Sequence, residues 1–183
     1  MSRPYSWNDR LIDIRRHLDD LHSRTYEGAS SRSDRDAVFL LAFQYLTPVA
    51  VGVLEDVNRD LLEGRGEITT EPPASDGAGG MRGGWVLTWP AQRAARHRLT
   101  GDAIEPLRLV AGFPADFLHA HLIAPMPGMP ERVVAWPLQV TNAEDAERQD
   151  TILRVLAEAL LHERVYQAGG NWALLGRSAA ESE

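Results

Sequence analysis

The sequence LRLVAGFPADFLHAHLIAPMPGMPERVVAWPLQV, residues 107–140, contains three stretches that are typical of β-strands. They lie at residues 107–111, 117–123 and 133–140, where apolar, β-branched and aromatic residues predominate. Turns rich in glycine and proline separate the three stretches, and no helical periodicity lies between them. Strands that follow one another in this way favour an antiparallel sheet, so this stretch decides the fold class.

Two further β-like stretches lie upstream, at residues 67–70 and 85–89. Between them, residues 72–84 begin with two prolines and continue with a run rich in glycine. Glycine loses the most conformational freedom on ordering, and this segment offers few apolar side chains that could anchor it. We therefore expect residues 72–84 to form a flexible loop.

An amphipathic helix is predicted near the N-terminus, because apolar residues recur there at alternating four- and three-residue intervals. These residues are Trp7, Leu11, Ile14, Leu18 and Leu21. We expect the helix to bury this apolar stripe against its own domain. The spacing is also that of a short heptad pattern, so a helix pair formed between two chains is the alternative.

Three more helices are predicted. Ser33 and Asp36 have the spacing of a capping box before the wholly apolar run at residues 37–43, which we expect at the centre of the core. Thr47 followed by Pro48 predicts the start of a separate helix, since proline is favoured in a first helical turn. A long helix with one apolar face is predicted near the C-terminus.

Together these elements predict an α+β fold. We expect an antiparallel sheet of about four to five strands, covered by the N-terminal helices and by one long C-terminal helix. We expect a single domain over residues 1–176, followed by a frayed acidic tail at residues 177–183.

The composition excludes several classes of chemistry. The chain contains no cysteine and no lysine, so all 19 residues of the Lys and Arg count are arginine. It can therefore form no thiolate metal site, disulfide, Schiff base or lysine-dependent phosphate loop. The formal net charge is −7, and arginine is scattered among Asp and Glu, which argues against nucleic acid as a partner.

The sequence also suggests where the protein resides. It shows no export signal at its start and no apolar run long enough to cross a membrane. The absence of cysteine fits a reducing compartment, and the use of arginine to the exclusion of lysine is typical of bacterial genomes rich in G and C. We expect a cytoplasmic bacterial protein that contacts no membrane.

The sharpest candidate for chemistry is the pair His119 and His121. Alternate residues of a strand face the same side, so the two imidazoles would lie about 6 to 7 Å apart and could share a divalent metal ion or a substrate. A metal needs a third ligand, and the candidates are His162, His97, Asp116 and Glu158. We predict His119, His121 and His162 as the metal ligands; catalysis by the pair without a metal, or a pair with no function, are the alternatives.

The same alternation predicts which side of this strand meets the core. Leu118, Ala120 and Leu122 would share the opposite side from the two histidines, and all three are apolar. We expect these residues to contact the helices, which leaves the histidines on the other face of the sheet, at a cleft, an interface or in water.

A short internal repeat offers a second candidate site. Residues 86–92 are VLTWPAQ and residues 133–139 are VVAWPLQ, so both copies carry Trp followed by Pro. Proline cannot donate to a β-ladder, and a strand end with an aromatic residue covering the core is the structural interpretation. The functional alternative is that Trp89 and Trp136 line one ligand-binding cleft.

These observations favour a non-enzymatic binding or accessory subunit that acts through a surface for a partner or a small ligand. Neighbouring residues supply no nucleophile, cofactor fingerprint or acid–base set, whereas amphipathic helices and tryptophans suit an interaction surface. The partner would be another protein or a second copy of the chain. The alternative function is a small enzyme or metal-binding protein that uses His119 and His121.

Overall fold

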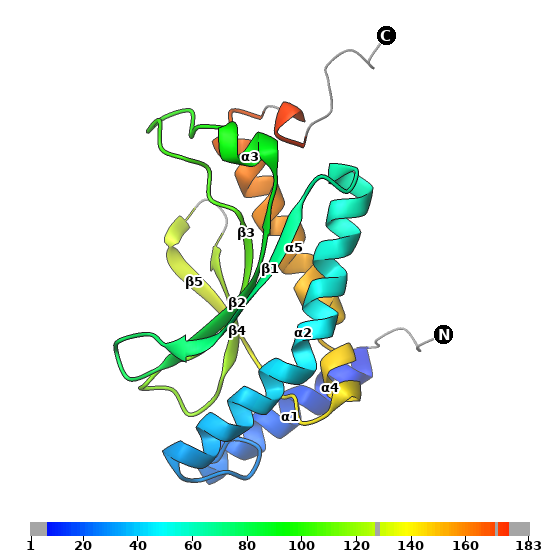
Figure 1. The fold of residues 1–183 in the computed structure, drawn as a ribbon. Helices are drawn as coiled ribbons and strands as arrows, with labels where there is room; N and C mark the ends of the chain where they lie inside the picture. Colours follow the sequence, from blue (N-terminus) through cyan, green and yellow to red (C-terminus); the bar gives the residue numbers. More distant parts are fainter. Residues whose placement is uncertain (1–6, 127–128, 171, 176–183) are drawn as a thin grey trace.

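The computed structural model describes residues 7–126, 129–170 and 172–175, and its centre is a five-stranded sheet. In chain order the strands are β1 (Glu67–Ser75), β2 (Met81–Thr88), β3 (Leu107–Phe113), β4 (His121–Met126) and β5 (Met129–Pro137). Each strand pairs with the next in an antiparallel manner, so the order across the sheet is the order along the chain (Figure 1). The predicted antiparallel sheet is therefore confirmed.

Helices lie on one side of this sheet (Figure 1). They are α1 (Trp7–Ser23), α2 (Arg32–Leu62), α3 (Pro90–Ala94), α4 (Ala143–Glu147) and α5 (Asp150–Gln167), with a 3₁₀ turn at Trp172–Leu175. Helix α2 packs on β1, β2 and β3, and α5 packs on β3. This arrangement confirms the predicted α+β class, with N-terminal helices and one long C-terminal helix. The predicted tail at residues 177–183 lies outside the described residues.

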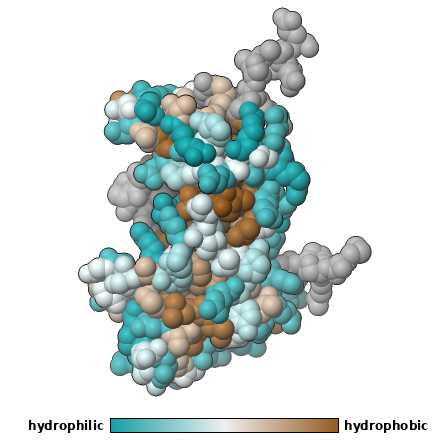
Figure 2. All heavy atoms as spheres, viewed as in Figure 1, coloured by the Kyte–Doolittle hydropathy of each residue, from teal (hydrophilic) through white to brown (hydrophobic). Residues whose placement is uncertain are grey.

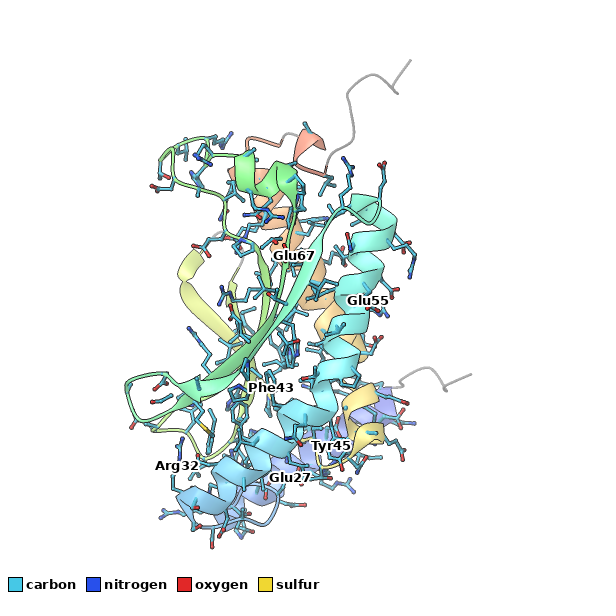
Figure 3. The ribbon with its side chains drawn as sticks, viewed as in Figure 1. Glu27, Arg32, Phe43, Tyr45, Glu55 and Glu67 are labelled. Carbon is cyan, nitrogen blue, oxygen red and sulfur yellow. The ribbon has the colours of Figure 1, made fainter. Side chains whose placement is uncertain are left out.

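The core forms where α2 meets the sheet. Phe43 points from α2 toward the strands (Figure 3), and its ring stacks on Trp85 of β2 with 4.5 Å between the ring centroids. Phe39, one turn earlier on α2, lies beside Phe113 at the end of β3. These contacts confirm that the apolar run of residues 37–43 reaches the centre of the core.

Helix α2 is one continuous helix, so the prediction of two helices separated at Thr47 and Pro48 is wrong. Pro48 lies inside it, although an interior proline loses one helical hydrogen bond and clashes with the preceding turn. The Thr47 hydroxyl donates to the Phe43 carbonyl and accepts from the Trp85 indole, which ties this turn to the sheet. Figure 1 shows α2 changing direction near its middle, as expected for a proline kink.

The N-terminal cap of α2 also differs from the prediction. Ser31, not Ser33, is the capping residue, and its hydroxyl oxygen accepts from the backbone N–H of Asp34. Helix α2 is also long and apolar enough to cross a membrane by length and composition alone, although Phe39, Phe43 and Leu46 on it are buried against the rest of the chain.

The prediction of a long loop at residues 72–84 is wrong. Strands β1 and β2 extend into this segment from both sides, and only residues 76–80 form the turn between them. The Asp76 carboxylate accepts from the backbone N–H groups of Ala78 and Gly80 and so closes the turn. The register shifts between Glu71 and Ala74, where the two prolines lie, because proline has no N–H to donate to the ladder.

Helix α1 is turned the opposite way from the prediction. Its apolar stripe is exposed, with 70% of the Trp7 surface and 57% of the Leu18 surface accessible to solvent. Asp13 and Asp20 are instead the buried residues of this helix. The expectation that α1 buries its apolar stripe is therefore wrong, because the part of the chain beneath the helix presents arginine and glutamine side chains rather than an apolar surface.

This orientation gives a test in two substitutions. Leu46→Ala should lower the free energy of unfolding by about 2 to 5 kcal/mol, because Leu46 is completely buried and its removal leaves a cavity. Ile14→Ala should lower it by about 1 kcal/mol or less, because 37% of the Ile14 surface is already exposed to solvent. Urea unfolding measures both values, and a loss at Ile14 as large as that at Leu46 would show that the stripe is buried.

Candidate functional site

A charged network holds the inward face of α1. The Arg16 guanidinium contacts Glu27 at 2.7 Å and Asp145 of α4 at 3.2 Å. Burial lowers the pKa of Arg16, but its hydrogen bonds to these two carboxylates outweigh burial and leave the pKa above its usual value. Asp13 lies 3.4 Å from Arg148, which follows α4. The loss of one partner in such a network leaves an uncompensated charge, which lowers the stability of the protein far more than the loss of a surface ion pair does. The network therefore fixes the orientation of α1.

Asp20 connects the end of α1 to the turn that follows it and to the chain after β5. Its carboxylate accepts from the Thr25 hydroxyl at 2.7 Å, the Glu27 backbone N–H at 2.9 Å and the Gln139 amide at 3.0 Å. Glu27 has a positive φ of 49°. Few residues adopt this conformation readily, and the hydrogen bond to Asp20 holds the backbone in it.

The predicted strand at residues 117–123 begins only at His121. Residues 115–120 form a turn and a bend, and the Phe117 N–H donates to the Pro114 carbonyl at 3.1 Å. Ala120 and Leu122 are completely buried, as predicted, whereas Leu118 is half-buried. His119 precedes the strand and is only 2% exposed, so its position is not set by strand alternation as predicted.

A third histidine joins the predicted pair. His17 of α1 contacts His119 with 4.5 Å between ring centroids, and its ring lies 6.3 Å from that of His121. Three nitrogens, His17 Nδ1, His119 Nε2 and His121 Nδ1, are buried without a hydrogen-bond partner in the described part of the chain. We call these three residues the histidine cluster.

Sequence reasoning missed His17, although one signal could have found it. His17 lies between Asp13 and Asp20 in the sequence, at the edge of the polar side of α1 where that side borders the apolar stripe. Once that polar side is recognised as the buried one, a histidine within it must face the body of the protein.

The histidine cluster is uncharged near neutral pH. Burial, and to a smaller extent repulsion from His17 and His119, lowers the pKa of His121 to about 4. Burial also lowers the pKa of His119, and burial together with repulsion from His119 lowers that of His17. The uncharged imidazole is the form that accepts a proton or ligates a metal.

The other predicted metal ligands lie elsewhere. His162 and Glu158 are exposed on α5, Asp116 is exposed, and His97 Nδ1 accepts from the backbone N–H groups of two following residues. Among the residues that the structure describes, no group of three or more His, Asp or Glu side chains is placed to hold a metal ion.

The two repeated tryptophans do not share a cleft. The pairing of the strands places Trp136 level with Gly83 of β2, six residues before Trp89 and therefore about 20 Å from it along the strands. Trp89 is buried, and its indole N–H donates to the Leu174 carbonyl at 2.5 Å. The expectation that both residues line one ligand-binding cleft is therefore wrong, and the structural interpretation of Trp89 is supported.

The remaining candidate surface is the exposed apolar stripe of α1, which we call the α1 stripe. Its members are Trp7, Leu11, Ile14, Leu18 and Leu21. Leu40 and Leu41 of α2 are exposed as well. Figure 2 shows apolar atoms at the surface over the lower half of the molecule, where the first half of α2 lies in front of α1 in Figure 1.

Comparisons of the chain with models of protein families, with curated proteins and with solved structures gave no significant match.

The histidine cluster predicts a pH dependence of stability. In the unfolded chain these histidines regain a pKa near 6.5, so below that pH the unfolded state binds protons that the folded state does not. The contribution to stability is complete above about pH 6.5 and is lost as the pH falls toward 4, the pKa of His121 in the folded state.

Urea unfolding at pH 7.5, 6 and 5 measures this loss. In the variant His121→Asn, which cannot take up a proton, the free energy of unfolding should fall less over this range than in the unaltered protein. Equal losses in the two proteins would show that His121 titrates normally in the folded state.

Proposed function

We propose that this protein is a non-enzymatic binding subunit, and that it binds a protein partner through the α1 stripe. The observation that carries this proposal is the orientation of α1, whose polar side is buried and whose apolar side is exposed. A surface helix of a soluble domain normally turns its apolar stripe to the core. An exposed stripe of this kind is typical of helices that are covered by another molecule.

The size of the stripe supports the proposal. Its five side chains expose on the order of 500 Å², which equals the largest apolar patch of a typical monomer and approaches the ~800 Å² that each partner contributes to a stable interface. Burial of this area would contribute roughly 10 kcal/mol before the costs of association are subtracted. The stripe alone can therefore provide most of the apolar area of a specific complex.

The charged network beneath α1 supports it as well. Arg16, Asp13 and Asp20 all bind groups outside the helix, so α1 is fixed before a partner arrives. A rigid helix loses little conformational freedom on binding. The cytoplasmic location expected from the sequence belongs to the same proposal.

Crosslinking tests whether the stripe meets another protein. A photoreactive phenylalanine analogue placed at Leu18 should form adducts of higher mass in the host cell, because a bound partner covers this position. The matched control is Val155 of α5, a single exposed apolar residue outside the stripe. Irradiation followed by denaturing electrophoresis reports both; no adduct from position 18, or equal adducts from both positions, would contradict the proposal.

A second candidate function is favoured by the three unpaired nitrogens of the histidine cluster. Their lowered pKa values leave them unprotonated at neutral pH, as metal ligation requires. At least one of the rings would have to turn for His17, His119 and His121 to coordinate one divalent ion.

Calorimetric titration with Zn²⁺ tests this second function. The protein should bind one ion, and the variant His119→Ala/His121→Ala should lose that binding. The variant His162→Ala is the control, since His162 is exposed on a different helix and should leave binding unchanged. No binding to the unaltered protein, or a loss in His162→Ala equal to that in the double variant, would exclude the cluster as the site.

A further inference from the structure

The α1 stripe has the residue spacing of one side of a coiled coil, and this spacing identifies the residues at its margins. Leu11 and Leu18 occupy the a positions of the heptad, and Trp7, Ile14 and Leu21 occupy the d positions. The margins of a heptad seam are the e and g positions, which contact the partner helix on either side. The stripe spans about 22 Å at 1.5 Å per residue, so it fits a partner helix of about four turns.

Each margin of the α1 stripe carries an arginine. Arg10 occupies a g position on one side, and Arg15 occupies an e position on the other. Within the described part of the chain, neither arginine forms an ion pair, whereas Arg16 on the inward side contacts two carboxylates. The formal net charge of the protein is −7, yet two arginines that form no ion pair among the described residues border the exposed apolar stripe of α1.

A second copy of the chain fits these margins poorly. In a parallel pair, each g residue faces the e residue five positions later on the other helix, so Arg10 would face Arg15 of the other copy twice. In an antiparallel pair, e positions face each other, and the two copies of Arg15 would meet. Like charges placed together at an interface disfavour that partner.

A lipid surface also fits poorly. Basic residues beside an apolar stripe are typical of helices that lie in a membrane interface. Here, however, the whole protein carries an excess of negative charge, which opposes its approach to anionic headgroups. The polar side of α1 is also occupied by contacts to the rest of the chain.

We infer that the α1 stripe binds an amphipathic helix of a different protein, whose apolar side covers Leu11, Ile14 and Leu18 and whose margins carry Asp or Glu opposite Arg10 and Arg15. This inference rests on the proposed function, namely that the α1 stripe binds a protein partner. The apolar seam supplies the affinity, and the two arginines select the partner by charge.

Two synthetic peptides of four helical turns provide the test. Both carry leucine and isoleucine at a and d positions; one has glutamate at its e and g positions, and the other has lysine. Fluorescence anisotropy of each labelled peptide gives its affinity for the full-length protein. At low salt the glutamate peptide should bind on the order of tenfold more tightly, and added salt should reduce this preference.

Three variants separate charge from apolar contact. Arg10→Glu/Arg15→Glu should reverse the preference between the two peptides, while Leu11→Ser/Leu18→Ser should abolish binding of both. Val155→Ser, an exposed apolar residue of α5, is the control that should bind as the unaltered protein does. Circular dichroism and thermal unfolding establish that each variant remains folded.

The outcomes distinguish this inference from the proposed function. If both peptides bind equally and Leu11→Ser/Leu18→Ser abolishes their binding, the inferred preference for acidic partner residues is overturned. The α1 stripe then remains a binding surface. Peptide binding that survives in Leu11→Ser/Leu18→Ser overturns the proposed function itself. The absence of binding by either peptide overturns the inference, and the crosslinking from position 18 then decides the proposed function.

Two measurements on the protein without peptide address the other occupants. Sedimentation should show a monomer at micromolar concentrations, and a dimer that Leu11→Ser/Leu18→Ser dissociates would overturn the inference in favour of a second copy. Flotation with vesicles of phosphatidylcholine and phosphatidylglycerol should leave the protein unbound. Vesicle binding that requires Leu11 and Leu18 would overturn it in favour of a lipid surface.

Discussion

The ion pairs between Arg16 and the carboxylates of Glu27 and Asp145 determine how α1 sits on the rest of the protein. A partly buried arginine needs carboxylate partners to offset the loss of water. A rotation of α1 that turned the apolar stripe inward would separate Arg16 from Glu27 and Asp145. The turn after α1 depends on the same arrangement, because Asp20 accepts hydrogen bonds from it and from Gln139 beyond β5. The neighbouring His17 is thereby carried into contact with His119. The histidine cluster and the α1 stripe are thus two consequences of one charged contact.

The sheet and the long helices could be predicted because their signals are local. Residues 107–140 alternate between β-like stretches and turns, and each β-like stretch contributes to a strand of the sheet. Pro48 shows where a local rule fails. Proline is favoured in the first turn of a helix, but this preference takes no account of the burial of Phe43 and Leu46 in the core beside Pro48. Burial of those side chains outweighs the roughly 3 kcal/mol that an interior proline costs.

The candidate site could be predicted only in part. His119 and His121 were found because they are neighbours in the sequence, but the strand that was to align them begins after His119. The orientation of α1 could not be predicted, since an amphipathic pattern shows that a helix has an apolar side and not which side the fold covers. His17 lies beside the acidic residues of α1 in the sequence, but its role depends on that orientation and on a contact between distant parts of the chain.

The two sides of α1 have different roles: the polar side stabilises the fold, and the apolar side is the proposed binding surface. Contacts of Asp13, Arg16 and Asp20 hold the helix, so changes on that side affect folding and the histidine cluster together. The α1 stripe contributes less to the folded monomer than the fully buried core does, because 37% to 70% of the surface of each of its residues stays exposed. Arg10 and Arg15 lie at the edges of the α1 stripe and form no ion pair with the residues that the structure describes. A charge in such a position acts mainly on a molecule that approaches the apolar surface.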